Sequence, residues 1–222
     1  MFLMECFNIG THYLAVGPHP DDVELGCAAT LFEIIKPDDK LLYITLSFCL
    51  DIERNKNIKE ELKKSQEFLK SMLPCEISFQ NFDFPNRKMF EKHMEIREAL
   101  EKARNQFDPD VVFSTSPKDL HQDHRYIGEE VMRVFRECTL ITYEIPRSVG
   151  IFIPNMYVSL SQNTVDKVVK IKELYQSQST QKYMSQDLVI GTLKHRGGEV
   201  GQNYAQAFEV IRIVVKNNKI FF

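Results

Sequence analysis

The chain has 222 residues, of which 43% are hydrophobic and 27% charged, so it resembles an ordinary soluble protein with a substantial core. Positive and negative side chains nearly cancel, at 28 against 31, and no basic run gathers on one stretch. This balance argues against nucleic acid as a partner. We find no secretory signal and no apolar run that could cross a bilayer. We therefore expect a cytoplasmic protein with a single domain over residues 1–222.

The cysteines form an odd, scattered set without CxxC spacing: Cys6, Cys27, Cys49, Cys75 and Cys138. Such a set argues against a disulfide framework and against thiolate zinc fingers. We expect reduced thiols that are mainly buried.

Short β-rich apolar runs alternate with amphipathic charged stretches from the start of the chain, the pattern of a parallel sheet covered by helices. Prolines fall between these elements, where a missing N–H does least harm. The pattern predicts an α/β fold, a Rossmann-like three-layer α/β/α sandwich with a mostly parallel sheet. The expected strands are His12–Val16, Lys40–Leu46, Glu76–Gln80, Asp110–Ser114 and Leu140–Glu144, with a late strand at Val210–Val215. The expected helices are Glu24–Ile35, Ile58–Ser71, Met89–Arg104, Arg125–Arg136 and Val165–Tyr175.

An imidazole and two carboxylates follow directly on the first strand, where open α/β sheets place their ligands. A tight loop could aim His19 and Asp22 at one ion, and a nitrogen with an oxygen ligand suits zinc. Asp21 is then left beside the metal as a free carboxylate that could act as general base. The alternative is that Asp21 or Asp22 only caps the helix that begins near Glu24.

A second polar segment, Ser114–His124, again follows an apolar strand. His124 can complete a His, Asp, His ligand set that leaves a fourth position for water, as in catalytic zinc sites. His121, held by Asp123, could assist the oxygen that becomes negative when a carbonyl carbon is attacked. Read alone, each segment also fits surface or capping residues. Together the two segments favour metal-assisted hydrolysis.

These segments resemble the two signatures of the PIG-L/LmbE-like deacetylases, which are zinc-dependent N-deacetylases of amino-sugar conjugates. The resemblance implies a Zn²⁺ cofactor bound by His19, Asp22 and His124, with Asp21 as general base. It also implies that His121 assists at the carbonyl oxygen and that Asp123 orients His121. The residues that carry the resemblance are Pro18-His19-Pro20-Asp21-Asp22-Val23-Glu24-Leu25-Gly26-Cys27, His121-Gln122-Asp123-His124, Phe107-Asp108-Pro109-Asp110-Val111-Val112, Tyr143-Glu144-Ile145-Pro146, Tyr175-Gln176-Ser177-Gln178, Arg196-Gly197 and Tyr204-Ala205-Gln206-Ala207-Phe208.

The chain departs from the family pattern at three places. Ala28-Ala29 stands where members commonly have two glycines. The stretch Ser47–Asn55 lacks the usual glycine before a substrate-contacting arginine, for which Arg54 is a candidate. Gln206 replaces a common glutamate. Substrate choice could differ accordingly.

The expected activity is removal of the acetyl group from an N-acetylated amino sugar that is free, nucleotide-linked or lipid-linked, in glycan or glycoconjugate biosynthesis. The alternatives are a related metal amidase or O-deacetylase, or a non-catalytic Rossmann-like module that holds a sugar or nucleotide. The chain lacks GxGxxG after its first strand, which argues against a dinucleotide module. Four cations in loops are candidates for binding a phosphate or sugar acid, although surface cations are mostly solvated: Arg54, Arg87, Lys88 and Arg147.

Overall fold

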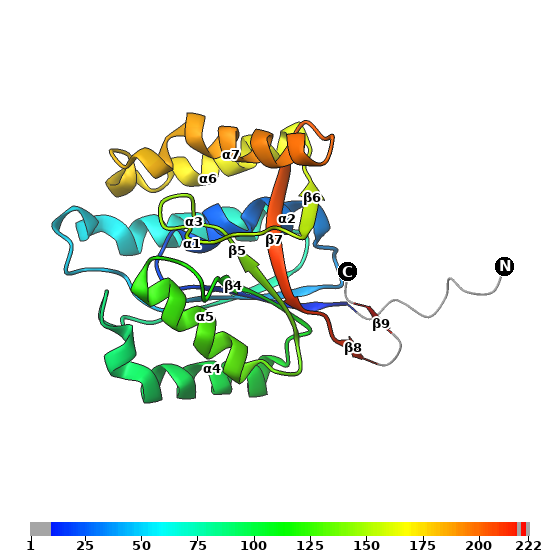
Figure 1. Ribbon diagram of the computed structural model, residues 1–222. Helices are drawn as coiled ribbons and strands as arrows, with labels where there is room; N and C mark the ends of the chain where they lie inside the picture. The colour runs from blue at the N-terminus through cyan, green and yellow to red at the C-terminus, as the bar shows by residue number, and fades with distance from the viewer. Residues whose placement is uncertain (1–9, 217–218, 221–222) are drawn as a thin grey trace.

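A seven-stranded sheet forms the centre of the molecule, in a computed structural model that describes residues 10–216 and 219–220. The strand order is β3-β2-β1-β4-β5-β7-β6. A separate two-stranded sheet, β8 (Val215–Lys216) and β9 (Lys219–Ile220), lies near the C-terminus (Figure 1). The strands of the main sheet are β1 (His12–Gly17), β2 (Lys40–Thr45), β3 (Glu76–Asn81), β4 (Val111–Thr115), β5 (Thr139–Tyr143), β6 (Met156–Ser159) and β7 (Ala205–Arg212).

The first five strands are parallel, whereas β7 runs antiparallel to both β5 and β6. The strand order reverses between β1 and β4, because the chain moves outward through β2 and β3 before it returns to pair β4 with β1. In open α/β sheets, ligands bind at this switch point, beyond the carboxyl ends of the strands. The loops after β1 and β4 therefore meet where a site is expected.

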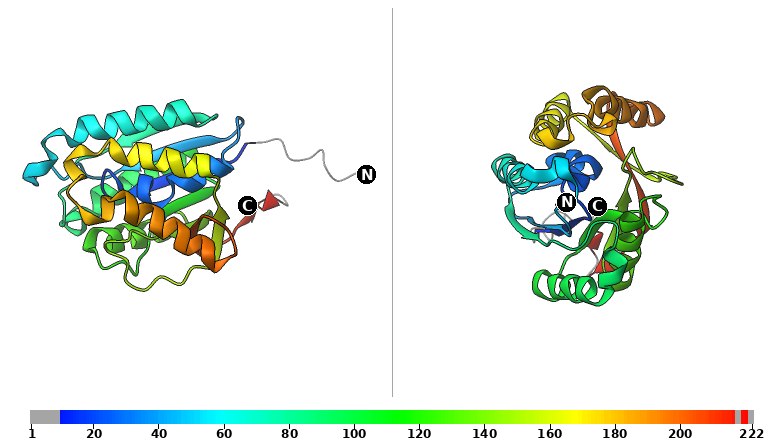
Figure 2. Two further views of the ribbon diagram at one scale, coloured as in Figure 1. Left: turned by 90° about the horizontal axis from the view of Figure 1, so that it is seen from above. Right: turned by 90° about the vertical axis from the view of Figure 1, so that its left-hand side faces the viewer.

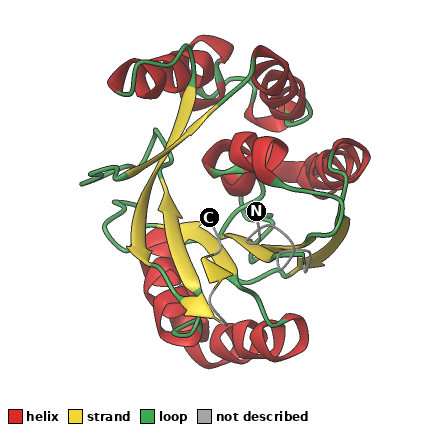
Figure 3. Cartoon of the chain, turned by 90° about the vertical axis from the view of Figure 1, so that its right-hand side faces the viewer, coloured by secondary structure: helices red, strands yellow, loops and turns green. Residues whose placement is uncertain are grey.

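Helices cover both faces of the sheet (Figures 1 and 3). One face packs against α4 and α5, and the other packs against α1, α2 and α3. On that side α6 packs against α1–α3 and α7 packs against β7, and the right-hand view of Figure 2 shows the α6–α7 pair as a further tier. The helices are α1 (Asp22–Gly26), α2 (Ala28–Ile34), α3 (Ile58–Met72), α4 (His93–Phe107), α5 (Gln122–Val134), α6 (Gln162–Glu173) and α7 (Gln186–Glu199), with 3₁₀ turns at Glu53–Asn57, Met89–Lys92, Gln176–Gln178 and Lys182–Met184.

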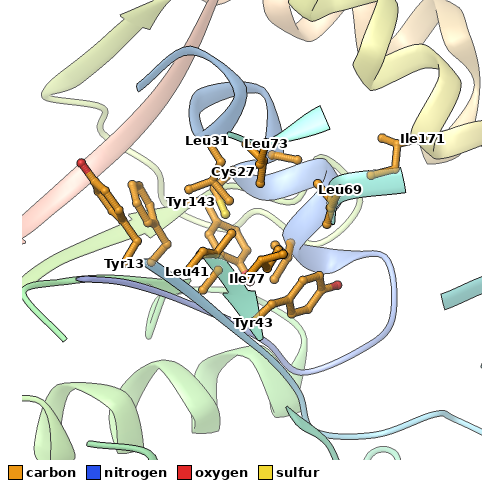
Figure 4. Packing of buried hydrophobic residues seen from close by; sticks show 14 of the residues in the cluster. Tyr13, Cys27, Leu31, Leu41, Tyr43, Leu69, Leu73, Ile77, Tyr143 and Ile171 are labelled. Carbon is orange, nitrogen blue, oxygen red and sulfur yellow. The ribbon is translucent and has the colours of Figure 1, made fainter. Parts of the chain in front are cut away.

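Alternate residues of each central strand enter opposite cores, as the two-residue period of a strand requires. In β1, Tyr13 and Ala15 join the cluster under α1–α3, and Leu14 and Val16 join the cluster under α4 and α5. Figure 4 shows the first cluster, in which Tyr143 packs beside Cys27. Burial on both faces explains why these strands are nearly continuous apolar runs. The predicted sandwich with a mostly parallel sheet is confirmed.

The five parallel strands lie within about one residue of their predicted bounds, but the helix predicted at Glu24–Ile35 is two helices. The break falls at Cys27, whose φ of −147° is not helical. The preceding Gly26 lies so close to Tyr143 that a Cβ there would come within 2.2 Å of the ring. The chain needs this glycine for close packing and turns after it.

The C-terminal part was predicted less well. The late strand expected at Val210–Val215 begins earlier, as β7, and both β6 and α7 were missed. The α7 sequence contains Gly191, Gly197 and Gly198, which lower helix propensity and resemble loop composition. Gly197 is needed because a Cβ there would meet the Tyr204 backbone at 2.8 Å.

In the described part of the chain, Cys27 and Cys49 are free and buried, Cys75 is also free, and Cys138 is buried. Cys75 is partly exposed, and Cys6 lies outside the described residues. Within residues 10–216 and 219–220, no helix has the length and apolar character needed to cross a membrane.

Candidate metal centre

A cavity of about 510 Å³ opens at the carboxyl ends of the parallel strands. Its size falls within the range of roughly 300–1,000 Å³ that is usual for small-molecule sites. Loops after all five parallel strands contribute to its lining, together with two residues of the later chain, Gln178 and Tyr183. The predicted residues His19, Asp21, Asp22, His121 and His124 all line this cavity.

Three donor atoms form a nearly equilateral triangle on the cavity floor. His19 Nδ1 lies 3.1 Å from His124 Nε2 and 3.3 Å from Asp22 Oδ2, and His124 Nε2 lies 3.3 Å from the same Asp22 oxygen. Zinc–ligand distances of about 2.0–2.2 Å would place tetrahedral ligand atoms about 3.3–3.6 Å apart. The geometry and the nitrogen and oxygen donors therefore fit one small cation.

A wider set of donors also surrounds this point. One ligand atom from each of His19, His121 and His124 lies within 4.8 Å of the others, and such a group could hold a metal ion. The rings of His121 and His124 are stacked, with centroids 4.5 Å apart. The two triads share His19 and His124, so they differ in whether Asp22 or His121 is the third ligand.

Two carboxylates outside the triangle orient the histidines that belong to it. His19 Nε2 lies 3.2 Å from Asp123 Oδ2, and His124 Nδ1 lies 3.1 Å from Asp119 Oδ2. A proton on each outward-facing nitrogen leaves the inward nitrogen with a free lone pair. Carboxylate–histidine pairs of this kind are the usual support of metal ligands. Ser148 donates a hydrogen bond to the same Asp119 oxygen at 3.1 Å.

The contacts of Asp123 differ from the expectation that its side chain orients His121. Its carboxylate bonds with His19 and accepts the backbone N–H of Arg87 at 2.6 Å and of Met89 at 3.4 Å. His121 instead bonds with the Asp123 backbone, whose N–H donates to His121 Nδ1 at 3.2 Å. The reason is local, because His121 is the N-cap of α5 and turns its ring over the first helical turn.

The alternative that Asp21 or Asp22 only caps a helix does not agree with the contacts of their carboxylates. Asp21 occupies the N-cap position of α1 but makes no side-chain capping bond. Its Oδ2 accepts the hydroxyl of Tyr183 at 3.0 Å, and Asp22 Oδ2 accepts the His19 N–H at 2.8 Å. Both side chains face the cavity instead of the helix end.

The electrostatics of the triangle favour a cation. Burial opposes a charge on the His124 ring, but the Asp22 and Asp119 carboxylates outweigh it and raise the pKa of His124 to about 10. Burial would likewise raise the pKa of Asp22, but the His124 charge and hydrogen bonds from both histidines hold it well below its ordinary value. The negative field that retains a proton here would also retain a metal cation.

The pKa values of Asp21 and His121, which lie beside the triangle, are shifted in opposite directions. Burial, and then the charge of Asp22, raise the pKa of Asp21 against the hydrogen bond from Tyr183. Burial, and then the charges of His19 and His124, lower the pKa of His121 to about 4. Asp21 is thus a carboxylate with increased proton affinity, and His121 is a neutral ring whose Nδ1 already accepts a hydrogen bond.

Sequence reasoning missed two residues of the centre. Asp119 stands two positions before His121 in the second polar segment, and its spacing alone gave no hint of a bond with His124. Tyr183 lies 162 positions after Asp21 on a 3₁₀ turn, and no local pattern marks it. The neighbouring Tyr175-Gln176-Ser177-Gln178 similarity was the nearest signal.

The glutamine at the third departure from the family pattern has a structural role. Gln206 Oε1 accepts the N–H of Thr30 at 2.9 Å, and its Nε2 donates to the Leu25 carbonyl at 3.2 Å. A carboxylate could accept the first bond but could not donate the second. The neutral side chain thus joins β7 to α1 and α2.

The fold and the centre together define an α/β enzyme whose strand-end loops form a candidate metal site. The family model of PIG-L, GlcNAc-PI de-N-acetylase, matches residues 14–135, which is more than half of the chain. The chain belongs to the PIG-L family and is a deacetylase of that family.

Individual proteins resemble the chain in sequence or in fold. The uncharacterized deacetylase YaiS of Escherichia coli (strain K12) is 28% identical over 167 residues, which cover 72% of this chain and 88% of that protein. The conserved protein TT1542 of Thermus thermophilus has a similar fold, with a TM-score of 0.72, 22% identity, and coverage of 90% of this chain and 94% of the other. The N,N'-diacetylchitobiose deacetylase of Pyrococcus horikoshii has a TM-score of 0.70 at 16% identity, over 90% of this chain and 84% of that one.

Proposed function

We propose that the chain is a zinc-dependent N-deacetylase that hydrolyses the acetamido group of a small-molecule amino-sugar conjugate. The observation that carries the proposal is the His19–Asp22–His124 triangle on the floor of a cavity, with the uncapped carboxylate of Asp21 beside it. Because the family is one of de-N-acetylases, an amide is the bond that we expect to be broken. The family description and the diacetylchitobiose deacetylase with a similar fold support an amino sugar.

The proposed ligands are His19 Nδ1, Asp22 Oδ2 and His124 Nε2, because only this set combines separations close to tetrahedral with oriented donors. Two imidazoles and one carboxylate with an open fourth position are a ligand set of catalytic zinc sites. When bound, it would polarise the amide carbonyl and lower the pKa of water. Asp123 and Asp119 hold the two rings in the required tautomers.

Asp21 is the proposed general base. It lines the cavity next to Asp22, its pKa is raised by burial, and the Tyr183 hydroxyl fixes one of its oxygens. Its carboxylate takes a proton from the water that attacks the acetyl carbon.

His121 is the proposed donor to the oxygen that becomes negative. Its Nδ1 accepts a backbone N–H, so the proton of the neutral ring is on Nε2. A neutral ring can donate a hydrogen bond to the oxygen, but it would become an imidazolate if it gave up that proton. Asp21, which by then carries the proton of the water, is therefore the group that protonates the leaving nitrogen.

Acetate release by zinc-loaded protein tests the proposal. The substrates would be N-acetylated amino sugars offered free, nucleotide-linked and lipid-linked, with an O-acetylated sugar as the control. We expect release that a chelator abolishes from at least one N-acetyl class and little from the control. Preference for the O-acetyl sugar would show that the protein is an esterase. If zinc is bound and no substrate releases acetate, an amino-sugar substrate is rejected.

A further inference from the structure

Three arginines line the cavity of the candidate metal centre. The side chains of Arg54, Arg87 and Arg147 form no ion pair with a carboxylate within the described part of the chain. By contrast, Arg97, Arg133 and Arg196 are each paired with a glutamate. The whole chain has a formal charge of −3, so unpaired cations in the cavity do not reflect a general excess of positive charge.

Arg87 is anchored to the metal centre through its backbone. It adopts a φ of 61°, which is uncommon for a residue other than glycine. Its N–H donates to Asp123 Oδ2, the same oxygen that lies 3.2 Å from His19 Nε2. Gln122 Nε2 donates to the Arg87 carbonyl at 3.4 Å. The backbone of Arg87 is therefore held close to His19.

The other two arginines are connected to the proposed base. The guanidinium of Arg147 lies 5.3 Å from the centre of the Tyr183 ring, and the Tyr183 hydroxyl donates to Asp21. Arg54 Nε donates to Gln178 Oε1 at 3.3 Å, and the Tyr183 hydroxyl lies 3.3 Å from the same oxygen. Both arginines are exposed and line the cavity, and each has further N–H donors for a ligand.

The lining carboxylates in the described chain do not balance these charges. They are Asp21 and Asp22, and both are already engaged, Asp21 with Tyr183 and Asp22 with the two histidines. A cavity with several unpaired cations focuses a positive potential on its contents. Guanidinium groups match carboxylate and phosphate oxygens through paired N–H donors.

We infer that the substrate carries an oxyanion group, either a phosphoester or a carboxylate, which Arg87 and Arg147 bind together with Arg54 while the acetamido group lies at the centre. This inference rests on the proposed function for the position of the acetamido group. The arginines set substrate choice, and the triangle and Asp21 carry out the chemistry.

Matched substrates test the inference by their kcat/KM values. N-acetylglucosamine is compared with its 1-phosphate for the phosphoester arm, and with N-acetylmuramic acid for the carboxylate arm. We expect at least one anionic sugar to exceed the neutral one by about tenfold or more, and the preference to fall with increasing salt. Arg87→Gln and Arg147→Gln should each lower the preference several-fold, and Arg87→Lys should restore part of it. Arg136→Gln, at an exposed arginine outside the cavity lining, is the control and should leave the preference unchanged.

Binding measured without turnover separates this inference from the proposed function. Glucose 1-phosphate and lactate, which contain no acetamido group, are titrated into the wild type and the same variants by calorimetry. Binding of either that is lost in Arg87→Gln supports the oxyanion site even if no substrate is deacetylated. Equal cleavage of neutral and anionic sugars, with no effect of the arginine variants, would overturn the inference and leave the deacetylase proposal intact.

Discussion

The two parts of the chain contribute to the centre in different ways. The parallel part, from β1 to β5, supplies every proposed ligand and the proposed base on loops that follow β1 and β4 directly. The later part supplies Tyr175 and Tyr183, whose hydroxyls bond with the loop after β1. Tyr175 donates to the Pro20 carbonyl and also to the buried Glu24 carboxylate.

This difference separates chemistry from positioning. Strand ends bring ligands together because parallel strands finish at one edge of the sheet. The loops themselves are short, and groups from α6 onward restrain them from outside. Substitutions in the first part should therefore abolish turnover, whereas substitutions in the second should weaken it or affect stability alone.

Replacement of the proposed base should have the largest effect. Asp21→Asn keeps the three ligands but removes the proton acceptor, so turnover should fall roughly 10²–10⁴-fold while zinc is retained. Acetate release and metal content, measured on the same preparation, check both halves of this prediction. Near-normal turnover in this variant would refute the assignment of Asp21.

Removal of the proposed oxyanion donor, His121, should have the second-largest effect on turnover. His121→Ala should lower kcat by roughly 10²–10³-fold with little change in KM, because the hydrogen bond forms mainly in the transition state. The exposed His195 on α7 offers the control His195→Ala, which should behave as wild type. A defect confined to KM would instead make His121 a substrate-binding residue.

Removal of a positioning group from the later part should have a smaller effect. Tyr183→Phe removes one hydrogen bond to Asp21, so kcat should fall about tenfold. That hydrogen bond lowers the pKa of Asp21, so its loss should raise this pKa and move the acid limb of the pH–rate profile to higher pH. Tyr157→Phe is a matched control outside the cavity lining. If kcat falls but the acid limb of the pH–rate profile does not move, Tyr183 acts only through packing.

The smallest effect on turnover is expected where the later part joins the parallel part outside the cavity lining. Arg196 on α7 holds Glu144, just after β5, through two hydrogen bonds of 2.8 Å. Arg196→Gln should lower the free energy of unfolding by about 1–3 kcal/mol, since a largely buried carboxylate loses its partner. Urea unfolding measures this loss, and kcat should remain near the wild-type value. A large loss of kcat without a loss of stability would contradict the division between the two parts.

The sequence predicts the first part well because its signals are local. The strands β1, β2, β4 and β5 are buried on both faces and are apolar runs, and the helices between the parallel strands have clear amphipathic periodicity. His19, Asp22 and His124 could be found because each follows such a strand. The structure brings the three together as expected, and their roles as ligands remain a proposal.

The later part and the supports of the site are harder to predict because their causes are tertiary. Gly197 in α7 is required because the Tyr204 backbone lies close to it. The short edge strand β6 is defined by its pairing with β7. The partner of Asp123 depends on how α5 begins, since its carboxylate reaches His19 across 104 positions of sequence. Such pairings exist only after the sheet has formed, so no window of sequence contains them.

The zinc content of two variants, Asp22→Ala and His121→Ala, tests the central claim most directly. Both residues adjoin His19 and His124, but only Asp22 belongs to the triangle with separations of 3.1–3.3 Å. After gel filtration, the account predicts about one zinc per chain in His121→Ala and little in Asp22→Ala. Zinc that is retained in Asp22→Ala and lost in His121→Ala would contradict the account and make the three histidines the ligand set.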